Sequence, residues 1–274
     1  MPAIPADLDW SQPRIMGILN VTPDSFSDGG HYTDLTAALR HAEAMTTAGA
    51  TLIDVGGEST RPGAEPVSVQ QELDRVIPVI AAIATRLPVM ISIDTSKAAV
   101  MREAVQAGAT LINDVNALQG EQAQATALAL GVPVCLMHKQ GEPASMQHQP
   151  HYTDVVQEVR TFLQTRAQPL LAAGMLPHQI LLDPGIGFGK TLAHNLTLLR
   201  ELRALTQLGH PILIGISRKS MLGAITGRAT TDRVAASVAA AVLALQHGAN
   251  ILRVHDVGPT ADALKVWSAI QQGS

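Results

Sequence analysis

The sequence predicts an α/β protein whose single domain, residues 1–274, folds as a (β/α)8 barrel. Short runs rich in β-branched and other apolar residues recur eight times, and longer segments rich in Ala, Leu, Gln and Glu separate them. The runs are apolar at successive positions, which is typical of parallel strands covered by helices on both faces of the sheet. An open doubly wound sheet is the alternative with the same alternation.

The predicted strands follow one another along nearly the whole chain. They are residues 14–20, 51–57, 89–96, 110–115, 132–138, 180–188, 211–219 and 251–256. Helical spacing of apolar residues is clearest in residues 35–49, 69–87 and 233–248. The longest irregular segment, 139–154, fits a connection after the fifth strand better than a domain boundary.

Polar residues stand at the carboxyl end of nearly every predicted strand. They are Asn20, Asp54, Glu58, Asp94, Asn113, Asp114, His138, Asp183, Arg218, Lys219, Arg253, His255 and Asp256. In an open sheet only the strands near the switch point need such ends, whereas a TIM barrel gathers all of them around one mouth. The pattern therefore favours the barrel and a polar site at its carboxyl end.

Composition narrows the classes of partner. The formal net charge is −4 and the basic residues are scattered, so we expect no nucleic-acid partner. The apolar stretch 234–249 is shorter than the roughly 20 residues of a membrane span, and the first residues do not resemble a secretory signal. We therefore expect a cytoplasmic protein with no membrane partner. The only cysteine, Cys135, is expected to be a buried structural thiol.

The segment "LLDPGIGFGKT" resembles a phosphate-binding P-loop but lacks its spacing, because Pro184 stands where the first glycine is required. Its glycines predict a turn after the strand in which the backbone approaches a ligand closely. Asp183, at the end of that strand, is either a ligand contact or a cap of the following segment.

The segments "GISRKS" and "RVHD" place cations at the ends of the last two strands. Lys219 alone could form a Schiff base, bind an anion or lie along a planar substrate. Arg253 and His255 share one side of their strand by the period of two. Because barrels commonly bind phosphate near strands seven and eight, the three side chains together predict an anion site.

Asp94, Asn113 and Asp183 end strands on the opposite arc of the predicted mouth. Their carboxylate and amide groups could recognise the donor and acceptor edge of a flat heterocycle, and an unmade hydrogen bond in a dry pocket costs about 1–3 kcal/mol. Helix capping is the alternative, for which Thr95 or Ser96 is better suited than Asp94. No zinc spacing of His and Cys occurs, so a metal would be a hard ion such as magnesium, shared with a phosphate.

Several segments together resemble the signature motifs of the dihydropteroate synthases, the pterin-binding TIM-barrel enzymes of folate biosynthesis. They are "IMGILNVTPDSFSDGG", "GATLIDVGGESTRPG", "SIDTSK", "LINDV", "LMHKQGEPASMQ", "LLDPGIGFGK", "GISRKS" and "RVHD". They occur in the order that the family shows and cover the chain from about Arg14 to its end. The resemblance implies a transferase that joins p-aminobenzoate to a dihydropterin methyl diphosphate and releases diphosphate.

The resemblance also implies roles for individual residues. The implied pterin-ring contacts are Asp94, Asn113, Asp183 and Lys219, in a pocket shaped by Met137, Phe188 and Gly215. Arg253 and His255 are implied anchors of the diphosphate, and Asn20 contacts both magnesium and diphosphate. The second mobile loop contributes Thr60, Arg61 and Pro62, with Arg61 helping to stabilise the departing anion, and Ser220 contacts the p-aminobenzoate carboxylate.

Phe26 lies in the loop after the first strand, where an exposed aromatic residue needs an explanation. The resemblance implies that it forms a wall of the p-aminobenzoate pocket; packing on the barrel rim is the alternative. Three rivals to the synthase remain, namely a methyltetrahydrofolate-using corrinoid methyltransferase, a catalytically silent pterin-binding paralogue and a Schiff-base aldolase that would use Lys219. Finally, residues 233–249 carry small apolar side chains around much of a helix, which predicts a homodimer.

Overall fold

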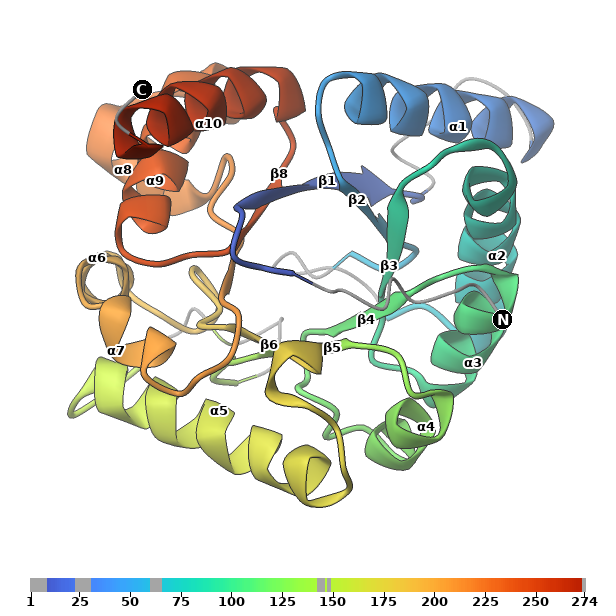
Figure 1. Cartoon of the computed structure of the whole chain (residues 1–274), viewed down its shortest axis with the longest axis horizontal. Helices are drawn as coiled ribbons and strands as arrows, with labels where there is room; N and C mark the ends of the chain where they lie inside the picture. Colours follow the sequence, from blue (N-terminus) through green and yellow to red (C-terminus); the bar gives the residue numbers. More distant parts are fainter. Residues whose placement is uncertain (1–8, 23–30, 60–65, 142–145, 147–148, 273–274) are drawn as a thin grey trace.

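The computed structural model describes residues 9–22, 31–59, 66–141, 146 and 149–272. Within them, eight parallel strands form one sheet in the order β6-β5-β4-β3-β2-β1-β8-β7, surrounded by helices (Figure 1). The strands are β1 (Arg14–Asn20), β2 (Leu52–Gly56), β3 (Met90–Asp94), β4 (Leu111–Asp114), β5 (Val134–Met137), β6 (Ile180–Asp183), β7 (Leu213–Ile214) and β8 (Ile251–Val254). The (β/α)8 barrel predicted from the alternation is confirmed.

The seam between β6 and β7 closes the barrel. Leu182 pairs with Ile212 in a parallel bridge, and the Leu182 amide donates to the carbonyl of Pro211 at 2.9 Å. This contact rules out the open doubly wound sheet. The predicted strand 211–219 was too long, because regular pairing ends at Ile214 and the backbone turns at Arg218, whose φ is 58°.

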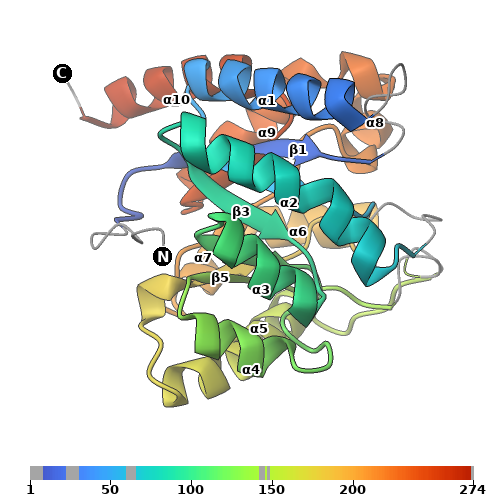
Figure 2. The same cartoon turned by 90° about the vertical axis from the view of Figure 1, so that its right-hand side faces the viewer.

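Helices cover the outside of the barrel between successive strands (Figures 1 and 2). They are α1 (His31–Thr47), α2 (Val69–Arg86), α3 (Ala98–Ala107), α4 (Ala123–Leu130), α5 (Val155–Ala172), α6 (Leu192–Arg200), α7 (Arg203–Thr206), α8 (Ser220–Thr226), α9 (Val234–Gln246) and α10 (Val257–Gln272). The predicted helices 35–49, 69–87 and 233–248 correspond to α1, α2 and α9. Across the described part of the chain, no helix has both the length and the apolar character that a membrane crossing requires.

Helix α2 illustrates how the local sequence fixes a helix. Ser68 is its N-cap: the Ser68 hydroxyl accepts a hydrogen bond from the Gln71 amide at 3.2 Å, and the Gln71 side chain accepts one from the Ser68 amide at 3.0 Å. This capping box contributes about 1 kcal/mol. Val76, Ile80 and Ile83 follow at helical spacing and are fully buried against the barrel.

The inside of the barrel is filled at its amino end by one apolar side chain from each strand. This layer consists of Met16, Leu52, Met90, Leu111, Cys135, Leu181, Leu213 and Ile251, with Trp10 beneath it. Cys135 is fully buried and free, as predicted, and burial raises the pKa of its thiol. A packed apolar plug fills the barrel interior at this end, and active sites of TIM barrels lie at the opposite, carboxyl end.

Candidate active site at the barrel mouth

Moving two residues along each strand from the apolar plug brings the next inward-pointing side chain. On five strands that side chain is polar, and these residues are Asp54, Ser92, Asn113, Asp183 and Arg253. Figure 2 shows β1 and β3 pointing in the same direction, as parallel pairing requires. The carboxyl end of the barrel, called the mouth from here on, is therefore lined with polar groups above an apolar floor.

Arg253 joins residues from three strands at the mouth. Its Nε donates to Asp54 Oδ2 at 2.6 Å, and its Nη2 donates to Asp94 Oδ2 at 2.8 Å. The same Asp54 oxygen accepts a hydrogen bond from Asn113 Nδ2 at 3.1 Å. Sequence analysis placed Arg253 and Asp94 on opposite arcs, and that separation is wrong for the side chains, because the two form a direct ion pair.

The charges in this network shift one another's ionisation. Burial alone would lower the pKa of Arg253, but Asp54 and Asp94 outweigh burial and hold the pKa above its usual value, so the guanidinium stays charged. Burial raises the pKa of Asp94 to about 7, although Arg253 opposes the rise. Near pH 7 the Asp94 carboxyl is therefore present in both forms and can either accept or donate a hydrogen bond.

Asp183 ends β6 and is held by the turn that follows. Its Oδ1 accepts a hydrogen bond from the Gly185 amide at 2.7 Å. Burial raises the pKa of Asp183, and the Lys219 ammonium opposes that rise. Gly185 has a φ of +66°, and an added Cβ would lie 1.8 Å from the carbonyl oxygen of His138, so only glycine fits here. Asp183 therefore both shapes this turn and faces the mouth.

Lys219 precedes α8 and reaches across to the same turn. Its Nζ donates to the carbonyl of Ile186 and lies 4.6 Å from the centre of the Phe188 ring. Burial lowers the pKa of Lys219 to about 8, while the Asp183 carboxylate opposes the shift. The Lys219 ammonium and the Phe188 ring thus form a cation–π pair at the mouth.

A second buried lysine, Lys190, holds the turn from behind. Its Nζ lies 2.9 Å from His138 Nδ1, and it donates to the carbonyls of Gly185 at 2.9 Å, Phe188 at 3.0 Å and His138 at 3.3 Å. Burial and the Lys190 charge together lower the pKa of His138 to about 3, so the imidazole is neutral and its Nδ1 accepts. Sequence analysis assigned no role to Lys190; its position after three glycines of one turn was the signal that could have revealed it.

The predicted anion side is arranged around β8 and the segment before α8. The His255 amide donates to Ser217 Oγ at 3.2 Å, and His255 Nδ1 lies 3.1 Å from the same hydroxyl. Arg218 is paired with Asp256, with Nε donating at 2.9 Å. Ser220 is exposed at the first residue of α8. Ser217 therefore orients His255, while the Arg218 guanidinium is already occupied.

Asn20 ends β1 beside the acidic part of the mouth. A Cβ added at Gly56 would lie 3.7 Å from both Asn20 Oδ1 and Asp94 Oδ2, so these two oxygens line the same spot. Within the residues that the structure describes, no group of three or more His, Cys, Asp or Glu side chains is arranged to hold a metal ion. The predicted magnesium contact, Asn20, places one amide oxygen at this position.

The remaining predicted pocket residues are placed only in part. Met137 is buried at the end of β5, with its Cγ 3.3 Å from the position of a Cβ on Gly185. A Cβ at Gly215 would lie 3.9 Å from the stem of Arg253. Phe26, Thr60, Arg61 and Pro62 lie outside the described residues.

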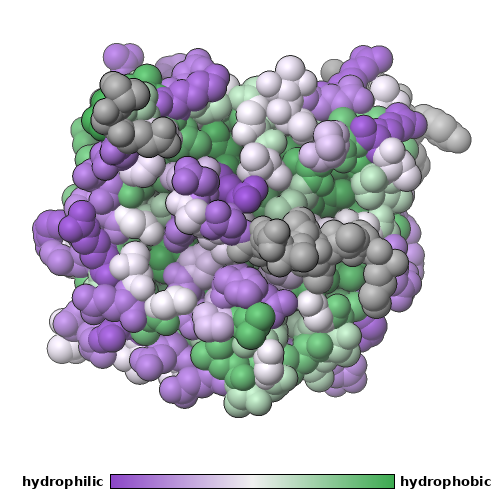
Figure 3. Space-filling model, viewed as in Figure 1, coloured by the Kyte–Doolittle hydropathy of each residue, from purple (hydrophilic) through white to green (hydrophobic). Residues whose placement is uncertain are grey.

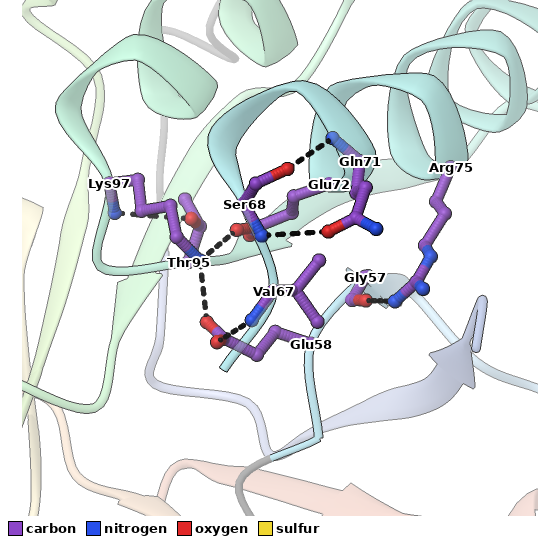
Figure 4. Close-up of polar contacts among 9 residues, drawn as sticks. All are labelled: Gly57, Glu58, Val67, Ser68, Gln71, Glu72, Arg75, Thr95 and Lys97. Atoms are coloured by element: carbon purple, nitrogen blue, oxygen red, sulfur yellow. Dashed lines mark hydrogen bonds and ion pairs between the residues drawn. The ribbon is translucent and has the colours of Figure 1, made fainter. Parts of the chain in front are cut away.

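An ion cluster beside the mouth was also missed by sequence analysis (Figure 4). Lys97 Nζ donates to Glu58 Oε2 at 2.7 Å and to Glu72 Oε2 at 2.5 Å, and Glu72 is fully buried. Glu58 Oε1 in turn accepts a hydrogen bond from the Val67 amide at 2.9 Å. The Lys97 ammonium thus ties the segment after β2, which holds Glu58, to α2 and to its own segment after β3. Within that last segment, Thr95 Oγ1 accepts a hydrogen bond from the Lys97 amide.

The barrel and the polar network at its mouth define a pterin-binding (β/α)8 barrel, and the chain matches the family described as "Pterin binding enzyme" over residues 16–255. Curated relatives narrow this class. The dihydropteroate synthase of Haemophilus influenzae is 53% identical over 262 residues, which cover 96% of this chain and 95% of the relative. The dihydropteroate synthase of Escherichia coli K12 is 51% identical over 262 residues, covering 96% of this chain and 93% of that protein. The chain belongs to the dihydropteroate synthases.

Solved structures agree with this assignment. The dihydropteroate synthase of Yersinia pestis in a sulfonamide drug complex superposes with a TM-score of 0.93 at 52% identity, over 99% of each chain. The Xanthomonas albilineans enzyme with 4-aminobenzoic acid gives a TM-score of 0.90 at 51% identity, covering 96% of this chain and 94% of that one. The same enzyme in complex with 7,8-dihydropteroate gives 0.87 at 48% identity, covering 96% and 95%.

Proposed function

We propose that the chain condenses p-aminobenzoate with (7,8-dihydropterin-6-yl)methyl diphosphate to give 7,8-dihydropteroate and diphosphate. The observation that carries the proposal is the network at the mouth, in which Arg253 connects Asp54 and Asp94 while Lys219 lies over the Phe188 ring. Relatives solved with 4-aminobenzoic acid and with 7,8-dihydropteroate share this fold, and their sequences are 51% and 48% identical to this chain.

The acidic part of the mouth suits the pterin ring. A pterin edge presents N–H donors, which the Asp94 and Asp183 carboxyls accept, while the Asn113 amide offers both a donor and an acceptor. Lys219 donates to a ring acceptor or lies along the ring face. Met137, Phe188 and Gly215 complete the walls of this pocket. Asn113 and Asp183 are buried and Asp94 and Lys219 are partly buried, so an analogue lacking one ring donor loses about 1–3 kcal/mol.

The leaving diphosphate is assigned to the cationic and amide groups of the mouth, of which Arg253 also contacts the acidic part. We propose Asn20, Arg61, Lys219, Arg253 and His255 as the catalytic groups, since positive and amide groups stabilise the charge that develops on the departing anion. Nucleophilic attack needs no strong base, because an aromatic amine is neutral at pH 7. Exclusion of water protects the electrophilic pterin methylene.

Magnesium fits this arrangement as an ion shared with the substrate. Its preferred ligands are oxygens, and it commonly keeps several waters and binds substrate phosphates rather than an all-protein cage. The Asn20 amide oxygen at the mouth meets this requirement, and its neighbour Asp94 adds negative charge nearby. When bound, Mg²⁺ would neutralise charge on the diphosphate.

The p-aminobenzoate side of the site is proposed from the family resemblance. Phe26 is its proposed wall, and Thr60 and Pro62 belong to the second loop, which helps to close over the substrates. Ser220, exposed at the start of α8, is the proposed contact of the p-aminobenzoate carboxylate. Substitution Ser220→Ala tests this assignment. It should raise the KM for p-aminobenzoate several-fold and leave the KM for the pterin substrate unchanged.

A coupled assay for diphosphate release, with dihydropteroate identified by mass, tests the proposed reaction. Product that appears only when both substrates are present supports the synthase. Binding of the pterin diphosphate without turnover would support the silent paralogue instead. Methyl transfer from methyltetrahydrofolate to a corrinoid, without use of p-aminobenzoate, would support the methyltransferase.

A homodimer through the late helices is proposed from exposed apolar side chains. Ile225 on α8, Leu243 on α9, and Val266 and Ile270 on α10 are 55%, 60%, 60% and 72% exposed. Helices α8 and α9 pack together, as do α9 and α10, and Figure 3 shows hydrophobic residues at the upper left, where Figure 1 places these helices. A surface of this kind is typical of a protein interface.

The cytoplasm is the proposed location of the reaction. It follows from the resemblance to bacterial folate-pathway enzymes. Cell fractionation followed by the diphosphate-release assay tests it; activity confined to a membrane or secreted fraction contradicts it.

A further inference from the structure

Lys190 is a buried cation that contacts no proposed substrate group. It is only 3% exposed, although a lysine is almost never this deeply buried without a partner. Its ammonium contacts carbonyl oxygens and an imidazole nitrogen, and no carboxylate forms an ion pair with it among the described residues. Such an arrangement needs a reason, because burying a charge is costly unless its donors are fully used.

The partners of Lys190 all belong to the wall of the ring pocket. The Gly185 and Phe188 carbonyls lie at the two ends of the turn after β6, and His138 directly follows β5. One ammonium therefore draws both ends of the turn together and fastens the turn to the neighbouring strand. The left-handed backbone at Gly185, Gly187 and Gly189 makes the turn tight enough for this.

The opposite side of the same turn faces the mouth. The Ile186 carbonyl accepts a hydrogen bond from Lys219, the Phe188 ring lies beneath the Lys219 ammonium, and the Gly185 amide donates to Asp183. These three contacts orient Lys219 and Asp183, two proposed pterin-binding side chains, and all three depend on the conformation of residues 185–188. Lys190 is the group that fixes this conformation from behind.

His138 completes the cage as a neutral acceptor. Its ring packs edge-on against Phe162, with centroids 4.9 Å apart, which fixes the direction of Nδ1. A charged imidazole could not accept from an ammonium, and burial together with Lys190 keeps the pKa of His138 far below its ordinary value. Burial lowers the pKa of Lys190 itself to about 7, an effect that Asp183 opposes. Near neutral pH the group is therefore present as ammonium and as amine, and both forms carry N–H donors for these acceptors.

We propose that Lys190, seated on His138, is a positioning residue for pterin recognition: it holds the turn after β6 in the shape that presents Phe188 and the Ile186 carbonyl to Lys219. The inference deepens the proposed function and rests on it. It assigns to Lys190 no contact with either substrate and no proton transfer.

Substitution Lys190→Met tests the inference, because methionine keeps the apolar stem and removes the donors. The Kd and KM for the pterin diphosphate should each rise at least tenfold, which corresponds to about 1.4 kcal/mol. The KM for p-aminobenzoate at saturating pterin should stay within threefold, because the proposed contact of its carboxylate, Ser220, lies on α8. The value of kcat should fall together with the rise in the pterin KM, because Lys219, a proposed catalytic group, is held by this turn. Steady-state kinetics and isothermal titration with the pterin diphosphate give these values.

Tyr152→Phe is the matched control. The Tyr152 hydroxyl donates to the carbonyl of Gly189 at 2.8 Å, so its loss removes a buried hydrogen bond to the same turn without touching Lys190. This variant should change the pterin KM less than threefold. Equal effects of the two substitutions, or a fall in kcat with an unchanged pterin KM in Lys190→Met, would overturn the inference.

His138→Gln provides the second variant should Lys190→Met fail to fold. The glutamine side chain keeps an acceptor for Lys190 but not the ring fixed by Phe162, so the pterin KM should rise between twofold and tenfold. No change in that KM would also overturn the inference. A wild-type protein that binds the pterin diphosphate but forms no product contradicts the proposed reaction alone, and the titrations then still decide the role of Lys190.

Discussion

Asp54→Asn isolates the effect of one charge at the centre of the mouth. Asp54 Oδ2 accepts both hydrogen bonds, from Arg253 Nε at 2.6 Å and from Asn113 Nδ2 at 3.1 Å. Asp54 Oδ1 is buried and has no hydrogen-bond partner within the described part of the chain. An asparagine whose oxygen occupies the Oδ2 position keeps both bonds and loses the negative charge, while its Nδ2 takes the place of Oδ1.

The expected cost follows from the difference between charged and neutral hydrogen bonds. A bond to a charged group contributes about 1.5–3 kcal/mol and a neutral one about 0.5–1.5 kcal/mol. Arg253 keeps its pair with Asp94, so Asp54→Asn should lower the free energy of unfolding by about 1–2 kcal/mol. Asp54→Ala also removes both bonds and should cost about 3–5 kcal/mol. Urea unfolding monitored by circular dichroism measures both values.

The pKa of Asp94 provides a second measurement, which reports the loss of the Asp54 charge and not the loss of stability. The Asp54 carboxylate is one of the groups that raise the pKa of Asp94, so Asp54→Asn should lower the Asp94 pKa from about 7. Carbon-13 NMR of the labelled carboxyl reports that titration. Equal losses of stability in the asparagine and alanine variants, or an unchanged Asp94 pKa, would refute the reasoning.

Three further predictions concern pH, backbone and assembly. Between about pH 4 and 7 the Asp94 carboxyl of the unfolded chain has lost its proton, whereas that of the folded protein keeps it in part. The free energy of unfolding should therefore fall as pH rises, by at most about 1.4 kcal/mol per pH unit. Urea unfolding at several pH values should show a smaller fall in Asp94→Asn. Gly185→Ala should lower the melting temperature more than Gly131→Ala, because both have φ near +66° but only the first places its Cβ against a carbonyl; equal shifts contradict this. Leu243→Glu should give a monomer mass by light scattering, whereas Leu196→Glu, 41% exposed on α6, should leave a dimer; a wild-type monomer contradicts the proposed interface.

The fold was largely predictable because its signal is local and repeated. Each strand shows its own apolar run, and α2 shows its cap and its helical spacing within a few residues. The strand-end positions Asn20, Asp94 and Asn113 followed from the same runs. The exception is β7, whose apolar run continues beyond Ile214 although its pairing does not, because pairing depends on neighbouring strands that the run itself does not describe.

The partners at the mouth were not predictable from local patterns. Arg253 is separated by 199 residues from Asp54 and by 159 from Asp94, and only barrel closure brings them together. A period of two predicts which side of a strand a side chain occupies, but it does not predict how far a long side chain reaches across the barrel. Lys190 was missed for the same reason, since its partner His138 lies 52 residues earlier.

The balance of charge at the mouth explains why these long-range contacts are there. The carboxyls Asp54, Asp94 and Asp183 face the cations Arg253 and Lys219, so the buried acids outnumber the bases that touch them. Burial raises the pKa of Asp94 and Asp183, which means that their charged forms are less well solvated here than in water. A flat ring that brings its own N–H donors supplies what the network lacks. Recognition of such a ring therefore relieves an electrostatic cost that the fold has already incurred, and the same cost discriminates against a ring without those donors.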